Sequence, residues 1–379
     1  MNIALIATEK LPVPAIRGGA IQIYLEAVSK RLAKHHHVTV ISIEDRDLKQ
    51  SETIDGVQFV RINQENYVAD VKALIKTKSF DVIHVCNRPL WIEQLKEASP
   101  KSKFILSVHN EMFAEGKMTE EDGVKCLSLV SKVVTVSDYI GMTITNRFSS
   151  AKGMVQTVYS GVDLSTYHPR WTTEGKNIRQ SVRSQLNLID KKIVLFVGRL
   201  SKVKGPHILL HSLPQIIEQH PDAHMVFIGS KWFGENNVNN YVKHLYTLGA
   251  MYPDNLTFIK FVEPKDIPKL YSMADVFVCC SQWQEPLARV HYEAMAAGLP
   301  VLTSDRGGNP EVIDEGRNGH IIHQFDQPEA YAQIINSLFS NEGNRERLGK
   351  NGRRQVEGQF GWDRVAGNLR TVYETAAKR

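Results

Sequence analysis

The sequence predicts an α/β protein with two doubly wound parallel-sheet domains. Its 379 residues are too many for one typical hydrophobic core, which favours two domains. Apolar runs of strand length alternate with helical patterns, and this alternation is typical of parallel sheets with helices on both faces. The expected strands, in chain order, are Ile3–Ala7, Val38–Ile43, Val57–Arg61, Val82–Val85, Phe104–Val108, Val133–Val136, Ile193–Val197, His224–Ile228, Leu256–Phe261, Val276–Cys280 and Pro300–Ser304.

We predict four segments along the chain. Residues 1–168 form an N-terminal domain, and residues 193–361 form a C-terminal domain. Residues 169–192 are polar, lack long apolar runs and begin with Pro169, so we expect them to be the linker that holds the hinge. Residues 362–379 follow a Phe-Gly-Trp break, and we expect a terminal helix that returns to the N-terminal domain, as is common in folds of this class.

Composition and cysteine spacing favour a globular, cytoplasmic protein. The chain starts in a strand-like run rather than in a basic and then apolar leader, so we expect no signal peptide. No apolar stretch approaches the ~20 residues that cross a bilayer, so we expect no transmembrane segment. The cysteines, Cys86, Cys126, Cys279 and Cys280, have neither metal nor disulfide spacing, which fits a reducing compartment.

The net charge of +5 is mild, but one basic cluster ends a predicted helix. It consists of Lys30, Arg31, Lys34 and His35–His37. A solvated helix end favoured by the helix dipole is the simpler interpretation. Weak contact with anionic lipid or with a polyanionic acceptor is the alternative. No basic stretch is interleaved with aromatic residues as in nucleic-acid motifs, so we expect no nucleic-acid partner.

Residues that could bind a ligand or take part in a reaction follow the predicted strands. Gly18 and Gly19 follow the first strand, and His109 follows the fifth. Arg199 and Glu285 follow two strands of the second half. Parallel α/β sheets bind ligands beyond the carboxyl ends of their strands. Two such edges facing each other would form a cleft between two Rossmann-like domains.

Two glutamates eight positions apart are the most informative feature. Glu285 is expected in a loop, and a helix is expected to begin near Ala288 and to stop at Gly298 and Pro300. Glu293 would then lie about five residues into that helix, roughly 7–8 Å along its axis. A diphosphate could rest on the free amides of the helix start, with a hydroxyl-rich ring near each carboxylate. This arrangement suits a nucleotide-sugar, whereas a bare pair of glutamates would more often be a solvated helix face.

Arg199 and Lys204 share one strand-to-helix loop. Cations beside a departing diphosphate stabilise the charge that develops on its oxygens. No Asp-x-Asp cluster is placed to bind a cation, so these two side chains would neutralise the diphosphate without a metal. A solvated loop is the alternative for this pattern alone.

Two glycine-containing loops complete the set. Gly18 and Gly19 let the backbone approach a ligand, but they do not form Gly-x-Gly-x-x-Gly, which disfavours a dinucleotide oxidoreductase. Gly308 and Asn309 follow the last expected strand, where Asn309 could reach sugar hydroxyls. A tight turn is the alternative in both places, and a strand-terminal His109 can equally be a structural residue.

Together these motifs resemble the donor site of the family 4 glycosyltransferases, which are retaining enzymes of the two-Rossmann-domain, GT-B class. Gly198, Arg199, Lys204 and Gly205 match the donor-phosphate motif of that family residue for residue. The resemblance implies catalytic roles at Arg199, Lys204, Glu285 and His109. It implies that the C-terminal domain binds the donor, that the N-terminal domain is the acceptor side, and that donor contacts come from Gly18, Gly19, Ala288, Arg289, Val290, Glu293, Gly308 and Asn309.

One departure from the family pattern affects the donor site. Leu287 and Ala288 stand where most members have Phe-Gly. Alanine is strained at a positive φ where glycine is not. If Ala288 needs such a conformation, donor binding would be weakened, whereas an earlier helix start would make alanine comfortable.

The resemblance implies a metal-independent retaining hexosyltransferase that uses a nucleotide-diphosphate sugar as substrate and needs no cofactor. Same-face attack, with the leaving phosphate assisting deprotonation of the acceptor, requires no dedicated base. A scaffold protein that keeps the fold but little activity is the main alternative, and a sugar-nucleotide epimerase has less support. Spore-coat-associated members share the stretches Thr8–Pro14, His84–Pro89 and Phe227–Gly234, which implies a coat polysaccharide or coat protein as acceptor and incorporation in the spore coat.

Overall fold

The computed structural model describes residues 1–229, 238–260 and 262–378. The chain divides into two compact units: Met1–Gly161 with the chain from Trp362 onward, and Val162–Gly361. The end of one expected strand, at Phe261, lies outside the described residues. So do residues 230–234 of the third stretch that resembles spore-coat-associated proteins.

The first unit is built on an eight-stranded sheet with the order β3-β4-β2-β1-β5-β6-β7-β8. Neighbouring strands are parallel except β3, which pairs antiparallel with β4 at one edge. The strands are β1 Asn2–Ile6, β2 His37–Ile43, β3 Ser51–Ile54, β4 Val57–Ile62, β5 Val82–Cys86, β6 Lys103–Val108, β7 Lys132–Thr135 and β8 Val155–Thr157.

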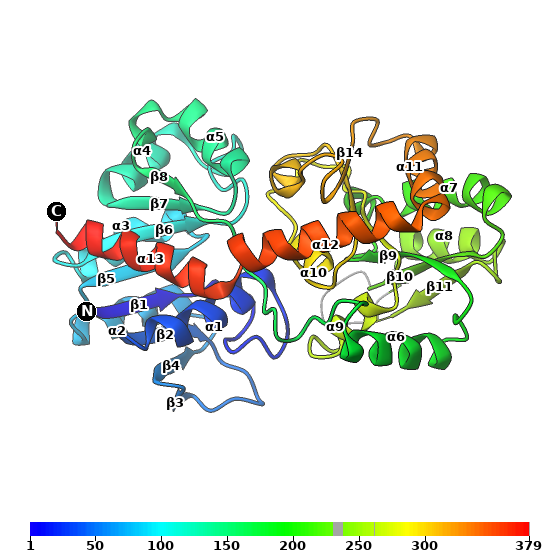
Figure 1. Cartoon of the computed structure of the whole chain (residues 1–379). Coiled ribbons are helices and arrows are strands. Elements are labelled where there is room, and N and C mark those ends of the chain that lie inside the picture. Colours follow the sequence, from blue (N-terminus) through cyan, green and yellow to red (C-terminus); the bar gives the residue numbers. More distant parts are fainter. Residues whose placement is uncertain (230–237, 261, 379) are drawn as a thin grey trace. The chain divides into compact units, whose positions relative to one another are not determined.

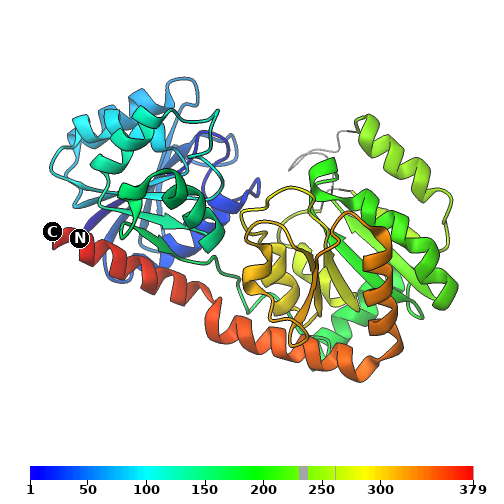
Figure 2. The ribbon, with the colours of Figure 1, turned by 90° about the horizontal axis from the view of Figure 1, so that it is seen from above.

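Helices cover both faces of this sheet, as Figures 1 and 2 show. Alternate residues of β1 enter two different cores: Ile3 and Leu5 pack with α1 and α13, whereas Ala4 and Ile6 pack with α2 to α5. Apolar residues on both faces are the signature of a buried parallel strand. The helical segments are α1 Ala20–Leu32, α2 Tyr67–Thr77, η1 Pro89–Trp91, α3 Ile92–Ala98, α4 Glu120–Leu129, α5 Asp138–Arg147, η2 Ser149–Ala151 and α13 Trp362–Ala377.

The second unit is built on a six-stranded, fully parallel sheet with the order β11-β10-β9-β12-β13-β14. Its strands are β9 Lys192–Val197, β10 Ala223–Ile228, β11 Leu256–Ile259, β12 Val276–Cys279, β13 Val301–Ser304 and β14 Gly319–Ile322. Its helical segments are α6 Thr173–Gln185, η3 Lys202–Lys204, α7 Pro206–Gln219, α8 Asn240–Gly249, α9 Ile267–Ser272, α10 Val290–Ala296, η4 Asn309–Val312, α11 Pro328–Ser340 and α12 Glu342–Gln359.

The structure confirms the expected fold class of two parallel-sheet α/β domains, and each expected strand is present with ends within two residues of those predicted. Three strands were missed. β3 is a short edge strand whose side chains alternate between exposed and half-buried, and β8 has only three residues. β14 has four residues, of which the first is a glycine. None of the three offers the continuous apolar run by which a buried strand is recognised.

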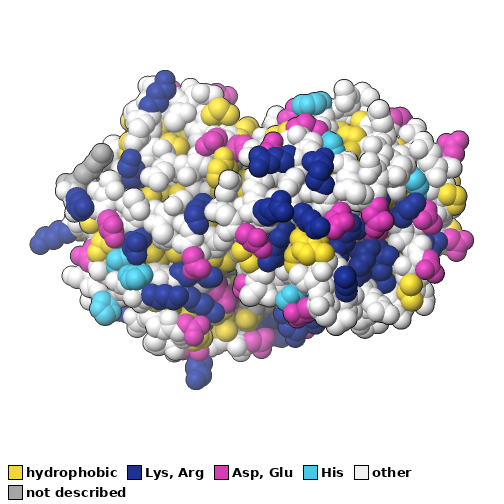
Figure 3. All heavy atoms as spheres, viewed as in Figure 1, with side chains coloured by type: hydrophobic (Ala, Val, Ile, Leu, Met, Phe, Trp, Pro, Cys, Tyr) yellow, Lys and Arg dark blue, Asp and Glu magenta, His cyan; other side chains and the backbone are white. Residues whose placement is uncertain are grey.

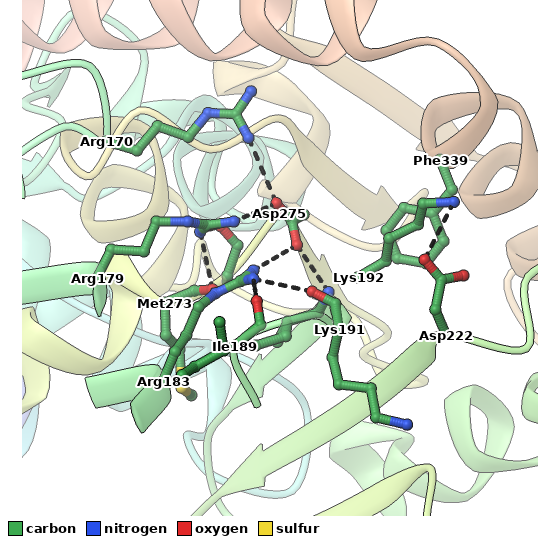
Figure 4. A network of polar contacts seen from close by, with 12 residues as sticks. Arg170, Arg179, Arg183, Ile189, Lys191, Lys192, Asp222, Met273, Asp275 and Phe339 are labelled. Atoms are coloured by element: carbon green, nitrogen blue, oxygen red, sulfur yellow. Dashed lines mark hydrogen bonds and ion pairs between the residues drawn. The ribbon is translucent and has the colours of Figure 1, made fainter. Parts of the chain in front are cut away.

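The segment expected to be a linker is folded instead. Residues 169–192 contain α6, whose Arg179 and Arg183 donate to the two carboxylate oxygens of Asp275 at 2.6 and 2.7 Å. Arg170 lies 3.4 Å from the same carboxylate, and Figure 4 shows the three guanidinium groups converging on it. The linker prediction is therefore wrong for this segment, because α6 is anchored to the second unit.

Asp275 is buried where β12 begins, and its carboxylate also accepts the backbone N–H of Ile193 at 2.8 Å. Burial by itself would raise the pKa of Asp275, but Arg179, Arg183, the amide of Ile193 and Arg170 outweigh burial, so the pKa lies below its ordinary value. The carboxylate is thus the charged centre that joins α6, β9 and β12.

Candidate functional site

Three adjacent strands of the second unit place the predicted donor residues at one edge of the sheet. β9, β12 and β13 are parallel neighbours, so the loops that follow them lie at the same carboxyl edge. The loop after β9 carries Arg199 and Lys204, the loop after β12 carries Glu285, and the loop after β13 carries Gly308. The expected clustering of these residues is found within the second unit.

Glu285 and Lys204 form an ion pair at this edge. Nζ of Lys204 lies 2.5 Å from Oε2 of Glu285, and the glutamate is only 6% exposed. The same Oε2 accepts from Nε1 of Trp283 at 2.8 Å and from Oγ of Ser281 at 2.9 Å. Within residues 1–229, 238–260 and 262–378, no donor reaches Oε1 of this carboxylate. One oxygen is therefore fixed by three donors, and the other remains available to a ligand.

The charge on Glu285 is maintained by these donors. Burial of Glu285 would raise its pKa, but Lys204, Trp283 and Ser281 together lower the pKa below its ordinary value. Glu285 is therefore an ionised carboxylate at neutral pH. Such a group can accept hydrogen bonds from hydroxyl groups but cannot act as an acid.

The backbone of the next loop packs directly against Glu285. Gly308 N–H donates to the carbonyl oxygen of Glu285 at 2.8 Å. Gly307 has φ 59°, and a Cβ there would lie 2.1 Å from the same carbonyl oxygen. Only glycine fits this conformation and this contact. The Gly307-Gly308 turn thus packs against the backbone of Glu285 and supports the loop that carries this carboxylate.

The helix after Glu285 begins later than expected. α10 starts at Val290 with Arg289 as its N-cap residue, so the predicted start near Ala288 is wrong by two residues. Ala288 is not among the residues with positive φ, and its N–H donates to Oδ1 of Asn309 at 3.1 Å. Alanine is therefore comfortable in the place where most family members have glycine.

Asn309 has a different environment from the one predicted. Its side chain is completely buried, and beyond its bond to Ala288 its Nδ2 lies 3.7 Å from Sγ of Cys279. The side chain of Asn309 thus ties the loop after β13 to the start of α10. The expected direct contact with sugar hydroxyls is not open to it in this structure.

Glu293 lies in the first turn of α10, and both of its oxygens are oriented by neighbours. Tyr271 donates its hydroxyl to Oε2 at 2.9 Å, and Arg289 lies 3.6 Å from Oε1. The Glu293 side chain is 14% exposed. Tyr271, Trp283 and Ser281 were not singled out from the sequence; the only signal for Trp283 and Ser281 is that they lie within four residues of Glu285.

The first unit holds the remaining predicted residues. His109 follows β6, its N–H donates to Oδ1 of Asn87 at 3.0 Å, and its Nε2 lies 3.1 Å from Oγ of Ser107. Its ring packs edge-on against Tyr24 with the centroids 5.1 Å apart. Burial lowers the pKa of His109 to about 4, so the imidazole is neutral at physiological pH.

Gly18 and Gly19 lead into α1, and both have positive φ, at 76° and 95°. The preceding Arg17 is held by Asp45 through two hydrogen bonds at 3.0 and 2.8 Å. The first unit thus places a glycine turn at the carboxyl end of β1 and a neutral histidine at the carboxyl end of β6.

Two members of the predicted basic cluster form ion pairs. In the predicted basic cluster, Lys30 lies 3.3 Å from both Glu26 and Asp55, and Arg31 lies 2.8 Å from Asp363. These pairs favour the interpretation of a solvated helix end.

Figure 3 shows Lys and Arg side chains of the second unit gathered along α12. No helix of the described residues has the length and apolar character that a membrane span requires.

Comparison with known proteins identifies the family. The sequence matches Glycosyltransferase Family 4 over residues 18–166 and Glycosyl transferases group 1 over residues 178–355. It is 46% identical over 375 residues to the putative glycosyltransferase YtcC of Bacillus subtilis (strain 168), which covers 99% of this chain and 92% of that protein. The chain therefore belongs to the glycosyltransferases described by these two models, Family 4 in its first half and group 1 in its second.

Other relatives extend the comparison. This glycosyltransferase is 65% identical over 374 residues to Spore coat protein SA of Bacillus subtilis (strain 168), which covers 99% of both chains. Among solved structures, Anabaena Alr3699/HepE in complex with UDP has a TM-score of 0.80 at 21% identity, with 99% of this chain and 100% of that chain covered. Sucrose-phosphate synthase from Thermosynechococcus elongatus has a TM-score of 0.81 at 23% identity, with 99% and 98% covered. These likenesses confirm the GT-B fold class.

Proposed function

We propose that the chain is a retaining glycosyltransferase that transfers a hexosyl group from a nucleoside-diphosphate sugar to an acceptor without a metal ion. The observation that carries this proposal is the buried Lys204–Glu285 pair, in which one carboxylate oxygen is fixed and the other is open to a ligand. An inactive scaffold would have no need for a buried carboxylate with one open oxygen at the carboxyl edge of the sheet.

Each residue has a distinct role in the proposed reaction. Oε1 of Glu285 accepts a hydrogen bond from a hydroxyl of the donor sugar. Lys204 and Arg199 stabilise the negative charge that develops on the departing diphosphate. Glu293, already oriented by Tyr271, accepts from the ribose hydroxyls. The neutral imidazole of His109 can donate one hydrogen bond to the sugar without adding charge.

The proposed mechanism needs no further base. The acceptor hydroxyl attacks on the face from which the diphosphate leaves, its proton passes to the leaving phosphate oxygen, and the anomeric configuration is kept. Charge neutralisation is assigned to Arg199 and Lys204, which both lie in the loop after β9.

The relatives guide the choice of donor and acceptor. The HepE structures contain UDP or UDP-glucose, so UDP-sugars are the first donors to test. The name of the relative Spore coat protein SA supports a spore-coat polysaccharide or coat glycoprotein as acceptor, and association with the coat. The impaired-scaffold alternative rested on Leu287-Ala288, and the ordinary φ of Ala288 removes its main support.

The test is a donor screen followed by product stereochemistry. Purified protein is mixed with UDP-, GDP- and ADP-sugars, binding is measured by thermal shift, and donor hydrolysis or transfer is followed by proton NMR. The proposal predicts stabilisation by at least one nucleotide-sugar and an initial product with the anomeric configuration of the donor. An inverted product would refute retention, and no binding of any nucleotide-sugar would refute the function itself.

A further inference from the structure

Three donors from different parts of the chain share one oxygen of Glu285. Ser281 lies two residues after the end of β12 and is fully buried, and Trp283 follows two residues later. Lys204 comes from η3, 81 positions before Glu285 in the sequence. The Trp283 and Ser281 bonds, at 2.8 and 2.9 Å, have ordinary lengths. The carboxylate would therefore keep two donors if Lys204 moved away.

Trp283 contacts both members of the ion pair. Its indole N–H donates to the carboxylate of Glu285, and Nζ of Lys204 lies 6.0 Å from the centroid of its ring. A cation at this distance from an indole is within the range of a cation–π attraction. One side chain thus fixes the carboxylate through its edge and attracts the ammonium through its ring.

Binding of a diphosphate creates a competition for Lys204. In the proposed reaction its ammonium must turn toward phosphate oxygens, and Glu285 then loses its only positive partner among the described residues that contact it. A carboxylate that is 6% exposed would be costly to leave without donors. Something other than Lys204 must hold Glu285 ionised and oriented while Lys204 serves the leaving group.

We propose that Trp283 is a positioning residue of the donor site, which holds Oε2 of Glu285 so that Oε1 faces the donor sugar after Lys204 has turned to the diphosphate. Ser281 assists from the strand end. The proposal rests on the proposed function, in which Glu285 contacts the sugar and Lys204 the diphosphate. Trp283 is assigned no contact with the sugar or the diphosphate, so its proposed effect on the reaction passes through Glu285.

The first experiment compares wild type with Trp283→Phe by calorimetry, using UDP and UDP-glucose as probes. Phenylalanine keeps an aromatic ring near Lys204 but lacks the N–H donor. UDP affinity is expected to stay within about twofold, whereas UDP-glucose affinity is expected to fall about tenfold, the effect of one hydrogen bond to a charged acceptor. Equal losses for both probes, or no loss for UDP-glucose, would overturn the proposal.

The matched control is Trp171→Phe. Trp171 is in the same unit and also has a lysine near its ring, with Nζ of Lys350 at 5.9 Å, but it does not contact either glutamate of the site. This variant should bind both probes as wild type does. A tenfold loss of UDP-glucose affinity here would show that the effect of Trp283→Phe is not specific to Glu285.

A second measurement does not depend on donor binding. The carboxyl group of Glu285 is titrated by carbon-13 NMR in ligand-free wild type, Trp283→Phe and Trp171→Phe. Loss of the indole donor should raise the pKa of Glu285, so its protonation begins at a higher pH in Trp283→Phe alone. An unchanged titration would overturn the positioning role even if neither probe binds wild type, an outcome that would itself refute the proposed function.

Discussion

The hydroxyl of Tyr271 lies 2.9 Å from Oε2 of Glu293, although the two residues come from different helices, α9 and α10. Tyr271 is completely buried, so its hydroxyl has a fixed direction. The bond orients Glu293 before any ligand arrives, and among the described residues Oε1 has only the longer contact to Arg289. A pre-oriented carboxylate loses less entropy when it binds two neighbouring hydroxyl groups.

Glu293→Gln should weaken UDP binding by about tenfold, because an amide oxygen accepts ribose hydroxyls less strongly than a carboxylate does. The same change should weaken 2′-deoxyuridine diphosphate much less, since that ligand lacks one of the hydroxyls. Calorimetry with both ligands checks this. Glu346→Gln, on the exposed side of α12, is the control and should leave both affinities unchanged. Parallel losses for the two ligands would place Glu293 away from the ribose.

Lys204→Ala should lower turnover on the order of a hundredfold, because removal of a cation from a departing diphosphate costs ~3 kcal/mol of transition-state stabilisation. Lys202→Ala is the control from the same short helix, since Lys202 is exposed and should be neutral. Donor hydrolysis is the measurement. Turnover by Lys204→Ala within threefold of wild type would show that the assigned role is wrong.

Lys204→Ala should also change stability in a way that depends on pH. The variant leaves the buried Glu285 with only the neutral donors Trp283 and Ser281, so the pKa of Glu285 should rise. A group whose folded pKa has risen loses part of its contribution to stability above the unfolded pKa. The melting temperature of the variant relative to wild type should therefore fall as the pH increases from 4 to 7.

Nucleotide binding should not require a metal. Because Arg199 and Lys204 supply the positive charge in the proposed site, UDP should raise the melting temperature equally with EDTA and with manganese. At a hundredfold excess over Kd the stabilisation should be roughly 2.7 kcal/mol. Loss of UDP binding in EDTA and its return with manganese would contradict the metal-independent mechanism.

Much of the fold could be predicted because parallel strands are buried on both faces. Ile3–Ala7 and Val82–Val85 are continuous apolar runs, and the structure places them as the neighbours β1 and β5. α6 could not be predicted in the same way. Its stability comes from arginines that meet Asp275 more than 90 positions later, and no local pattern reveals such a pairing.

The candidate site likewise contains residues that could be predicted from the sequence and contacts that could not. The residues at strand ends, such as Arg199 and Glu285, could be predicted because the topology of a parallel sheet brings strand ends together. The ion pair between Lys204 and Glu285 joins residues 81 positions apart, and the buried side chain of Asn309 contacts Ala288 and Cys279, which lie 21 and 30 positions earlier. Contacts of this kind depend on the tertiary structure. The sequence motifs therefore indicated where the site is, but not which side-chain atoms already have partners within the protein.

Asp275→Asn should destabilise the second unit by about 3–5 kcal/mol, because it leaves three buried or half-buried arginines without their carboxylate. Denaturant unfolding measures the loss. Asp222→Asn is the control. Its contact with Lys192, drawn in Figure 4, is longer, at 3.4 Å, and half-exposed, so its loss should cost under about 1 kcal/mol.

The difference in the free energy of unfolding between wild type and Asp275→Asn should increase as the pH rises from acid to neutral. The folded pKa of Asp275 lies below its unfolded value, so its contribution to stability is complete above the unfolded pKa of about 3.9 and is lost as the pH falls through the folded pKa. The stabilities of the two proteins should therefore differ most near neutral pH and become similar in acid. A difference that grows below pH 4 would contradict the assigned network.

Ala288→Gly tests whether the departure from the family pattern impairs this glycosyltransferase. Ala288 has no positive φ, its N–H is bonded to Asn309, and its carbonyl oxygen lies 2.7 Å from Nδ1 of His291. Glycine would relieve no strain and would increase the entropy of the unfolded chain, at a cost of about 0.4–1 kcal/mol. We expect a slightly lower melting temperature and a UDP-glucose affinity no better than wild type. Gly343→Ala, at an α12 position where a Cβ meets only the side chain of Asn341 at 3.7 Å, is the reverse control and should stabilise by a similar amount. A glycine variant that gained both affinity and stability would mean that Ala288 is strained, and would favour the scaffold interpretation over an active enzyme.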